Sequence, residues 1–558
     1  MENYPWYKAY PNGVPKEINP DQYLSILELF EECVEKFGDA PAFINMGAGL
    51  TYRQLDVESK KFAAYLQNVA GLEKGDRVAI QMPNLLQFPV ALFGVLRAGM
   101  VVVNTNPLYT SREMAHQFND SGAKAVVILT NFGHNLEKIL KYTQIKLIIT
   151  TELGDLLGGV KGHLVNFVVK RIKKMVPAFN LPEAIPFKQA LREGKRQVYH
   201  RPETDAEDLA FLQYTGGTTG VSKGAMLTHR NMVSNMEQNC AWMGVDLDDG
   251  KEVVITALPL YHIFALTVNC LTMMKKGAKN VLITNPRDMP AFIKELKRYP
   301  FSVITGVNTL FNGLLNQPAF QQVDFDKLKV AVGGGMAVQD AVAQEWKRIT
   351  GRPLVEGYGL TETSPVLSCN PLDGSERLGT IGLPFPSTEL KLVDENNQVV
   401  PVGGVGEICA RGPQVMKGYW QKPEETSNVF MVDWLKTGDM GTVDEEGFFR
   451  IVDRKKEMIN VSGFNVYPNE IENVIALMDG VLEVGVIGVP DDKSSEVVKA
   501  FIVKKNPSVT EDEIKEFCKE NLTAYKVPKF IEFRDELPKS NIGKIMRRLL
   551  KEGEPAEG

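Results

Sequence analysis

One short stretch, residues 215–224, gathers the residue types that hold phosphate groups. Its sequence, TGGTTGVSKG, contains four glycines, four hydroxyl residues and one lysine in ten positions. Glycines let the backbone turn so that several N–H groups point at one spot, while hydroxyls and a lysine add donors and positive charge. We therefore predict a loop that binds a polyphosphate. Its glycines are Gly216, Gly217, Gly220 and Gly224, its hydroxyl residues Thr215, Thr218, Thr219 and Ser222, and its lysine Lys223.

The spacing of this stretch excludes two common nucleotide-binding motifs. It does not match GxxxxGK followed by serine or threonine, and no GxGxxG follows an expected strand. P-loop and dinucleotide-binding folds are therefore not predicted. The alternative is a glycine-rich surface loop without a ligand, but ordinary turns seldom combine glycines, threonines and a lysine so densely.

The elements that must position this loop alternate between short apolar segments and helical patterns. A helix is expected over 52–69, followed by a strand in DRVAIQM (76–82), and the alternation resumes after residue 207 with LAFLQY (209–214). Such alternation is typical of β-α-β units with a largely parallel sheet. Between about 374 and 447, short strands with glycine and proline turns predict an antiparallel β subdomain instead.

The chain is long enough for more than one hydrophobic core. We predict a large α/β N-terminal domain over 1–453, with parallel-rich sheets, helices and the β subdomain. A charged stretch at 454–457 is the expected hinge, and 458–558 form a small, mobile α+β C-terminal domain.

Composition narrows the class of protein further. The net charge of −6 argues against a dedicated nucleic-acid binder. The six cysteines are scattered without a CxxC or a His/Cys cluster, so neither a disulfide framework nor a zinc site is predicted. The first residues do not resemble a secretory signal, and the apolar segments are too short to span a bilayer. A cytoplasmic protein is expected, and a homodimer is left open.

One segment, 158–177, suggests contact with a membrane. It carries five basic residues and no acid, and its apolar residues fall near helical spacing. A basic amphipathic helix of this kind suits an anionic membrane surface, such as the inner face of the cytoplasmic membrane. A surface helix packed by one face is the equal alternative.

The loop is one of seven motifs that follow one another in a recognisable order. In the order of these motifs the chain resembles the adenylate-forming superfamily, and the detailed sequence of the motifs is similar to that of bacterial long-chain fatty acyl-CoA synthetases. The motifs are YTGGTTGVSKG (214–224), LPLYHIF (258–264), VGGGM (332–336), EGYGLTE (356–362), KTGD (436–439), DRKKEMINVSGFNVYP (453–468) and PKSNIGKI (538–545).

The resemblance implies that the chain activates a long-chain fatty acid with ATP and Mg²⁺, first forming an acyl-adenylate and pyrophosphate and then an acyl-CoA thioester. Glu362 would be the Mg²⁺ ligand, Thr361 would bind the α-phosphate, and His262 would shape the carboxylate pocket. The implied phosphate-binding residues are Tyr214, Thr215, Gly216, Gly217, Thr218, Thr219, Gly220 and Lys223. Many members have a hydroxyl residue at the place of Gly216 and a proline at that of Ser222, which leaves a second side-chain contact to metal or phosphate open.

The remaining motifs supply the rest of the implied site. Lys544 would bridge the carboxylate and the α-phosphate during adenylation. The small domain would then turn about Lys456, so that the backbone around Gly463 borders the CoA channel. Tyr358 would stack on adenine, and Asp439 and Arg454 would hold the ribose. The implied lining of the base and acyl entrance is Gly334, Gly335, Met336, Glu356, Gly357 and Gly359.

Two other functions remain open at this point. The acyl group could pass to a carrier protein or to oxygen instead of CoA. The chain could also be a fatty-acid binding or uptake protein whose nucleotide site is only regulatory. The polar residues Lys544, Glu362, Asp439 and Arg454 are all present, which favours an enzyme.

Overall fold

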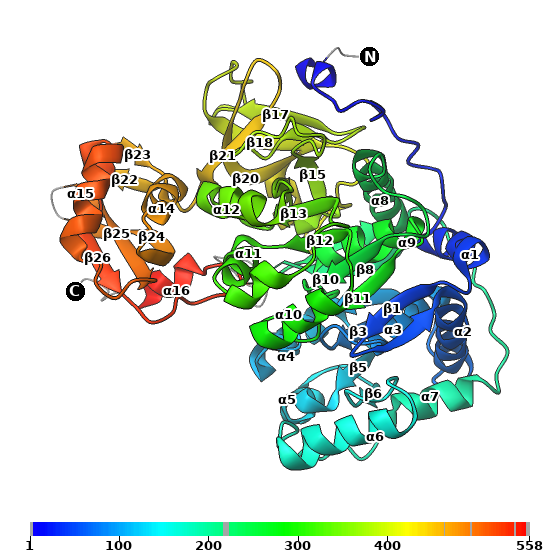
Figure 1. The fold of residues 1–558 in the computed structure, drawn as a ribbon. Helices are drawn as coiled ribbons and strands as arrows, with labels where there is room; N and C mark the ends of the chain where they lie inside the picture. The colour runs from blue at the N-terminus through cyan, green and yellow to red at the C-terminus, as the bar shows by residue number, and fades with distance from the viewer. Residues whose placement is uncertain (1–3, 216–221, 463, 492–493, 541–542, 554–558) are drawn as a thin grey trace.

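The computed structural model describes residues 4–215, 222–462, 464–491, 494–540 and 543–553, and Figure 1 shows how their elements are arranged. A seven-stranded sheet has the order β7-β6-β5-β3-β4-β8-β9. Its strands are parallel except for β9, which pairs antiparallel with β8. Their bounds are β3 Arg77–Gln81, β4 Val101–Asn104, β5 Ala125–Leu129, β6 Leu147–Thr151, β7 Ile185–Pro186, β8 Leu209–Tyr214 and β9 Gly224–Thr228.

A nine-stranded sheet follows, in the order β16-β15-β14-β13-β12-β10-β11-β1-β2. Its six central strands are parallel, and antiparallel strands close both edges. The predicted α/β class with parallel-rich sheets is confirmed. The bounds are β1 Pro41–Asn45, β2 Ala48–Thr51, β10 Val253–Thr256, β11 Lys279–Leu282, β12 Val303–Gly306, β13 Val330–Gly334, β14 Val355–Gly359, β15 Val366–Cys369 and β16 Leu383–Pro384.

Helices cover these sheets, and their ends follow the expected sequence signals. Thr51 begins α2 and Thr228 begins α8 with capping boxes, in which the threonine hydroxyl accepts from a backbone N–H of the first turn. All eleven residues of α3 are buried, which explains its continuous apolar pattern. The helices are α1 Ile26–Phe37, α2 Tyr52–Asn68, α3 Gln87–Arg97, α4 Ser111–Ser121, α5 Gly133–Ile139, α6 Gly159–Phe167, α7 Phe187–Gly194, α8 His229–Met243, α9 Met273–Lys275, α10 Met289–Arg298, α11 Asn308–Leu315, α12 Asp340–Thr350 and α13 Pro423–Val429.

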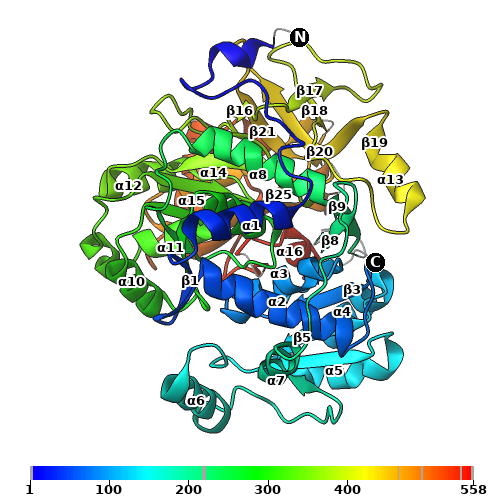
Figure 2. The same ribbon diagram turned by 90° about the vertical axis from the view of Figure 1, so that its right-hand side faces the viewer.

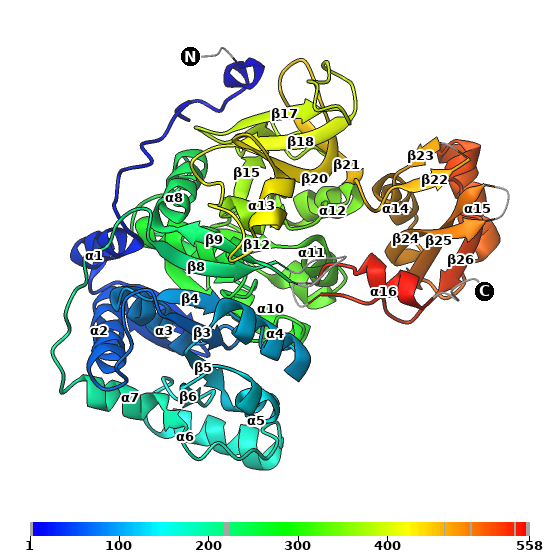
Figure 3. The ribbon, with the colours of Figure 1, turned by 180° about the vertical axis from the view of Figure 1, so that it is seen from behind.

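The antiparallel β region lies beside the nine-stranded sheet (Figure 3). Its order is β17-β18-β20-β19, with β21 paired to β20, and every pairing in it is antiparallel, as predicted. The N-terminal arm runs to this region, where the Trp6 and Phe449 rings pack with centroids 6.2 Å apart. The strands are β17 Glu389–Val393, β18 Gly406–Arg411, β19 Phe430–Met431, β20 Trp434–Val443 and β21 Phe449–Arg454.

The C-terminal elements form a smaller lobe that stands apart from the rest in Figures 1 and 3. Its sheet has the order β23-β22-β25-β24, with β26 parallel to β25. Two apolar clusters are made of residues from this lobe, so the lobe has a hydrophobic core of its own. The loop before α16 reaches back toward α11 (Figure 1). The bounds are β22 Ile459–Val461, β23 Phe464–Val466, α14 Pro468–Ala476, β24 Val481–Asp491, β25 Ser495–Lys504, α15 Glu511–Asn521, β26 Phe530–Phe533 and α16 Arg547–Glu552.

Three sequence-based expectations concern single features. All six cysteines are free thiols in the structure. Within the described ranges, no helix combines the length and the apolar character that a bilayer span needs. The expected continuous helix over 158–177 is interrupted, because α6 changes at Val168 into a π-helical turn, Val168–Ile172. Both segments lie at the periphery of the molecule (Figure 2).

Candidate functional site

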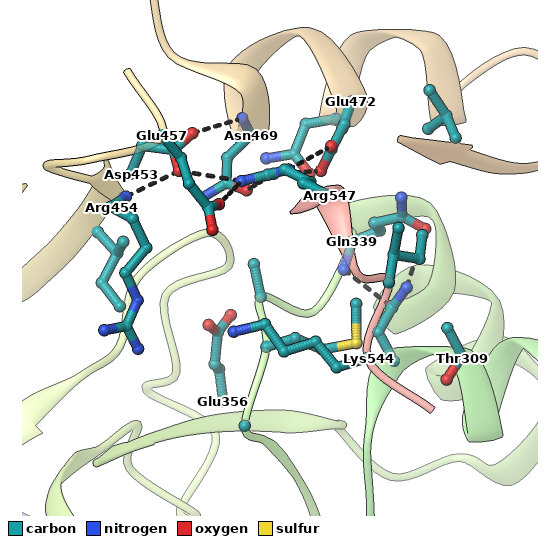
Figure 4. Close-up of a pocket in the computed structure, with 18 of the residues that line it drawn as sticks. Thr309, Gln339, Glu356, Asp453, Arg454, Glu457, Asn469, Glu472, Lys544 and Arg547 are labelled. Atoms are coloured by element: carbon teal, nitrogen blue, oxygen red, sulfur yellow. Dashed lines mark hydrogen bonds and ion pairs between the residues drawn. The ribbon is translucent and has the colours of Figure 1, made fainter. Parts of the chain in front are cut away.

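A cleft lies where the C-terminal lobe meets the large part of the molecule (Figure 4). Strands β14, β20 and β21 and helix α11 supply one side, and α14, β24 and the loop before α16 supply the other. The cleft therefore joins motifs that lie far apart in the sequence. The residues predicted from the sequence that line it are Gly335, Met336, Glu356, Gly357, Tyr358, Gly359, Asp439, Arg454 and Lys544.

Asp439 is the centre of a buried polar cluster in this cleft. It lies directly opposite Arg454 in the antiparallel β20–β21 pair, so their side chains meet, with Arg454 Nε 2.7 Å from Asp439 Oδ1. The Tyr358 hydroxyl donates to Asp439 Oδ2 at 2.6 Å. Burial, followed by the charge of Asp439, raises the pKa of Tyr358 well above its usual value, so this hydroxyl stays protonated. The three predicted nucleoside-binding residues therefore form one hydrogen-bonded unit.

Close backbone packing explains the glycines beside Tyr358. A Cβ at Gly359 would lie 1.9 Å from the carbonyl oxygen of Pro365, so no other residue fits there without moving the chain. A Cβ at Gly334, at the end of β13, would lie 3.0 Å from the Phe264 ring and 3.1 Å from the Gly357 carbonyl oxygen. Neighbouring backbone and ring atoms therefore leave little room for a side chain at either position.

Lys544 enters the cleft from the C-terminal lobe. Its backbone is held in a tight loop, in which Ser540 N–H donates to the Lys544 carbonyl at 2.7 Å and Lys544 N–H donates to Ser540 Oγ at 3.1 Å. The Thr309 hydroxyl of α11 donates to the Gly543 carbonyl at 2.8 Å and ties the loop to the large part. Burial, and then the charge of Arg454, lowers the pKa of Lys544 to about 8.

Two more titratable side chains border the site. Desolvation, and then the nearby charge of Lys544, lowers the pKa of His262 to about 4, so its imidazole is neutral at pH 7. This state suits a residue that lines a pocket. Burial raises the pKa of Glu356 to about 8, and its carboxyl accepts from Val338 N–H at 3.1 Å. The sequence pointed to the backbone of Glu356, whereas its side chain also faces the cleft (Figure 4).

The two ends of the glycine-rich loop come together. Thr215 N–H donates to the Lys223 carbonyl at 3.0 Å, and the Tyr214 hydroxyl donates to Asp120 at 2.7 Å. A Cβ at Gly224 would lie 3.1 Å from the Tyr214 ring, which explains the glycine there. The predicted residues Gly216, Gly217, Thr218, Thr219, Gly220 and Gly463 lie outside the described residues.

Glu362 and Lys223 belong to a second polar cluster. Glu362 lies in the short turn Thr361–Thr363, where its Oε1 accepts from the Tyr419 hydroxyl at 2.7 Å. The Lys223 ammonium lies 5.2 Å from the centroid of the Tyr419 ring and pairs with Glu425. Sequence reasoning missed both Tyr419 and Glu425. They reach the loop because Met226 N–H donates to the Gly418 carbonyl at 2.9 Å, a long-range pairing that no local pattern signals.

Electrostatic coupling connects the two clusters. Burial and the charge of Arg454 lower the pKa of Lys456, and Lys223 contributes to the same effect. Burial disfavours the charged form of Arg454, but nearby anions, Asp439 first and Glu362 among them, raise its pKa above the usual value.

Comparisons with known proteins show the family of this chain. Residues 30–420 match the family described as AMP-binding enzyme, and residues 470–544 match the AMP-binding enzyme C-terminal domain. The chain belongs to the AMP-binding enzyme family.

Individual relatives are similar over nearly the whole chain. A long-chain-fatty-acid–CoA ligase of Escherichia coli O6:H1 is 60% identical over 547 residues, 98% of both chains. One of Yersinia pestis is 58% identical over 553 residues, 99% of this chain and 98% of that protein. Among solved structures, the anthranilate CoA ligase AuaEII in complex with anthranoyl-AMP has a TM-score of 0.86 at 25% identity, covering 96% of this chain and 98% of that one.

Proposed function

We propose that this chain activates long-chain fatty acids with ATP, through an acyl-adenylate, to acyl-CoA, releasing AMP and pyrophosphate. The observation that carries the proposal is the position of Lys544 in the same cleft as the Tyr358–Asp439–Arg454 cluster. The substrate class rests on the 60% identical relative named for long-chain fatty acids.

The first half-reaction brings two anions together, so its main requirement is positive charge at the reacting atoms. We propose that Lys544 contacts the fatty-acid carboxylate and the α-phosphate while the carboxylate attacks phosphorus and pyrophosphate leaves. Lys223 and the rest of the glycine-rich loop, 215–224, hold the leaving phosphates, and Thr361 supports the α-phosphate. Asp439 accepts from the ribose hydroxyls, Arg454 holds Asp439, and Tyr358 lies under adenine. Neutral His262 lines the carboxylate pocket.

Glu362 is suited to bind Mg²⁺ together with the phosphates. Mg²⁺ is usually held in such sites by one or two carboxylates and the substrate phosphates, not by a cage of protein ligands. Glu362 offers one carboxylate for such a site, and its Oε1 accepts from the Tyr419 hydroxyl at 2.7 Å. When bound, the ion neutralises phosphate charge. Tyr419 keeps the Glu362 carboxylate oriented.

The second half-reaction needs the CoA thiol to reach the adenylate from the side that Lys544 now occupies. We propose that the small domain, 458–558, turns about Lys456 within the hinge 454–457, withdraws Lys544 and brings the segment around Gly463 to the site. CoA is the proposed acceptor because the 60% identical relative is named as a CoA ligase. A carrier protein or oxygen as acceptor, and a binding protein with a regulatory nucleotide site, are the alternatives that the next experiment distinguishes.

Purified protein with ATP, Mg²⁺ and palmitate should release pyrophosphate and, when CoA is added, form palmitoyl-CoA and AMP. Mass spectrometry of the acyl product identifies the acceptor. If palmitoyl-adenylate persists when CoA is present, the adenylation step is supported but CoA is not the acceptor. Release of no pyrophosphate with any fatty acid would contradict the proposed function. A series of shorter acids sets the chain-length range.

We also propose that residues 158–177 contact an anionic membrane. Helix α6 packs through Gly162, where a Cβ would lie 2.4 Å from the Gly154 carbonyl oxygen. Val165 packs against the core, but Leu164 and Phe167 are 59% and 57% exposed, and Ile172 of the following π-helical turn is 64% exposed. A surface helix packed by its apolar face would bury these residues. Exposed apolar residues among basic ones are what an anionic lipid surface binds. The basic residues are Lys161, Lys170, Arg171, Lys173 and Lys174.

The double variant Phe167→Asp with Ile172→Asp should reduce binding to vesicles that contain phosphatidylglycerol by about tenfold or more, because two apolar side chains lose their contact with lipid. Co-sedimentation measures the bound fraction. Val432→Asp is the matched control, because Val432 is 94% exposed on a different surface, at the β19–β20 turn. Equal binding of the double variant, or equal binding to neutral phosphatidylcholine vesicles, would contradict the proposal.

A further inference from the structure

Arg547 is the hub of a buried ion cluster three residues after Lys544 (Figure 4). Its side chain is 12% exposed and contacts three carboxylates. Both Nε and Nη2 face Glu472, at 2.9 and 2.7 Å, and Nη1 faces Glu457 at 2.5 Å and Asp453 at 3.1 Å. Nη2 also donates to the Asn469 side chain. A guanidinium with this many charge-assisted hydrogen bonds is held in a fixed orientation.

The partners of Arg547 divide at the hinge. Glu457, Asn469 and Glu472 follow Lys456 in the sequence, and the latter two lie on α14 of the C-terminal lobe. Asp453 precedes Lys456 and belongs to β21, where it lies opposite Met440 of β20 in the antiparallel sheet. Of the partners named, Asp453 is thus the one on the other side of the hinge.

Asp453 accepts two hydrogen bonds from the C-terminal lobe. It is fully buried, and each of its oxygens has a partner in the lobe. Oδ1 accepts from Arg547 Nη1 at 3.1 Å, and Oδ2 accepts from Asn469 N–H at 2.9 Å. Oδ1 also accepts from the neighbouring Arg454 N–H at 2.7 Å, a bond that does not depend on the lobe. A buried carboxylate that loses donors is costly, so the two bonds from Arg547 and Asn469 favour the present position of the lobe.

The same arrangement sets the position of Lys544. Arg547 is the first residue of α16, and the short loop before it carries Lys544 into the cleft. Because Glu472 and Asn469 of α14 fix the Arg547 guanidinium within the lobe, a rotation of the lobe turns that guanidinium away from Asp453. Hydrogen bonds are directional, so the bonds from Arg547 and from Asn469 N–H cannot both survive a large rotation.

We propose that Asp453, by accepting from Arg547 and Asn469 N–H across the hinge, is a positioning residue that holds Lys544 in the adenylation site and must release the lobe for thioester formation. The proposal rests on the two-step reaction proposed above. It predicts an effect that a merely structural role would not produce: the two half-reactions should respond differently to loss of this contact.

Asp453→Asn tests the proposal, because it keeps the size of the side chain and an oxygen for Asn469 N–H but removes the charge that faces Arg547. Pyrophosphate release without CoA should fall about tenfold or more, the usual effect of losing a hydrogen bond between charged groups. Thioester formation from supplied palmitoyl-adenylate and CoA should stay at the wild-type rate or rise. Retained thioester formation also shows that the variant is folded.

Glu472→Gln is the matched control, because it weakens an Arg547 ion pair that lies wholly within the lobe. Its effect on the two half-reactions should be similar, in contrast to that of Asp453→Asn. Equal slowing of both half-reactions in folded Asp453→Asn, or no change in either, would overturn the proposal. Should Asp453→Asn not fold, Arg547→Lys replaces it, since a lysine keeps the charge but loses the planar fork. Wild-type protein that releases no pyrophosphate would instead sink the proposed function.

Discussion

Lys544→Ala should lower the rate of acyl-adenylate formation about 100-fold or more, as the loss of one positioned charge-stabilising donor does in other active sites. Pyrophosphate release without CoA measures this step. Lys539→Ala is the matched control: Lys539 lies on the same loop but pairs with Glu483 at 2.6 Å, outside the role proposed for Lys544. Near-normal pyrophosphate release by Lys544→Ala would contradict the proposed role.

The lowered pKa of Lys544 gives the same prediction a second readout. Lys544 is charged below its pKa of about 8 and neutral above it. The kcat/KM for adenylation, which reports the free enzyme, should therefore fall as the pH rises through about 8. Lys544→Arg keeps its charge throughout this range. The adenylation rate of the Lys544→Arg variant is therefore expected to stay constant as the pH rises through about 8, even if it is lower than that of the wild type. If the wild-type rate stays constant through this pH range, adenylation does not depend on the charge of Lys544.

Much of the fold was predictable because local patterns determine its elements. The helix expected over 52–69 is α2, Tyr52–Asn68, since a capping box and an apolar face mark it in the sequence. The order of strands was not predictable. Strand β1 precedes β3 in the chain, yet it joins the other sheet, where Phe43 lies beside Asn280. That pairing depends on contacts between distant segments, which no window of sequence contains.

The candidate site divides in the same way. The motif residues that line the cleft were named because their order resembles a family, whereas Arg547 in isolation is part of an ordinary basic run. Its partners Asp453, Glu457 and Glu472 look like surface acids in the sequence, and only the fold places them around one buried guanidinium. Tyr419 was missed for the same reason, because a long-range backbone pairing brings it to Glu362.

The second substitution expected to have a large effect on adenylation is at Glu362, the partner of Tyr419 on the phosphate side of the site. Glu362→Gln keeps the shape of the side chain and an oxygen that can accept from Tyr419, but removes the negative charge that favours Mg²⁺. Adenylation should fall about 100-fold or more at ordinary Mg²⁺ concentrations, because the charge of the phosphates is then poorly neutralised. Titrating Mg²⁺ while following pyrophosphate release measures the effect, and excess Mg²⁺ should restore part of the rate.

Tyr419→Phe separates the metal ligand from the residue that orients it. It removes one hydrogen bond, 2.7 Å long, to Glu362 and leaves the carboxylate in place. Loss of such an outer partner typically costs about 10- to 100-fold in metal affinity or activity, so Tyr419→Phe should shift the Mg²⁺ titration in the same direction as Glu362→Gln but less far. A Glu362→Gln enzyme with the wild-type Mg²⁺ dependence would show that Glu362 serves the turn Thr361–Thr363 and not the ion. A shift in Tyr419→Phe without one in Glu362→Gln would place the ion beside another group.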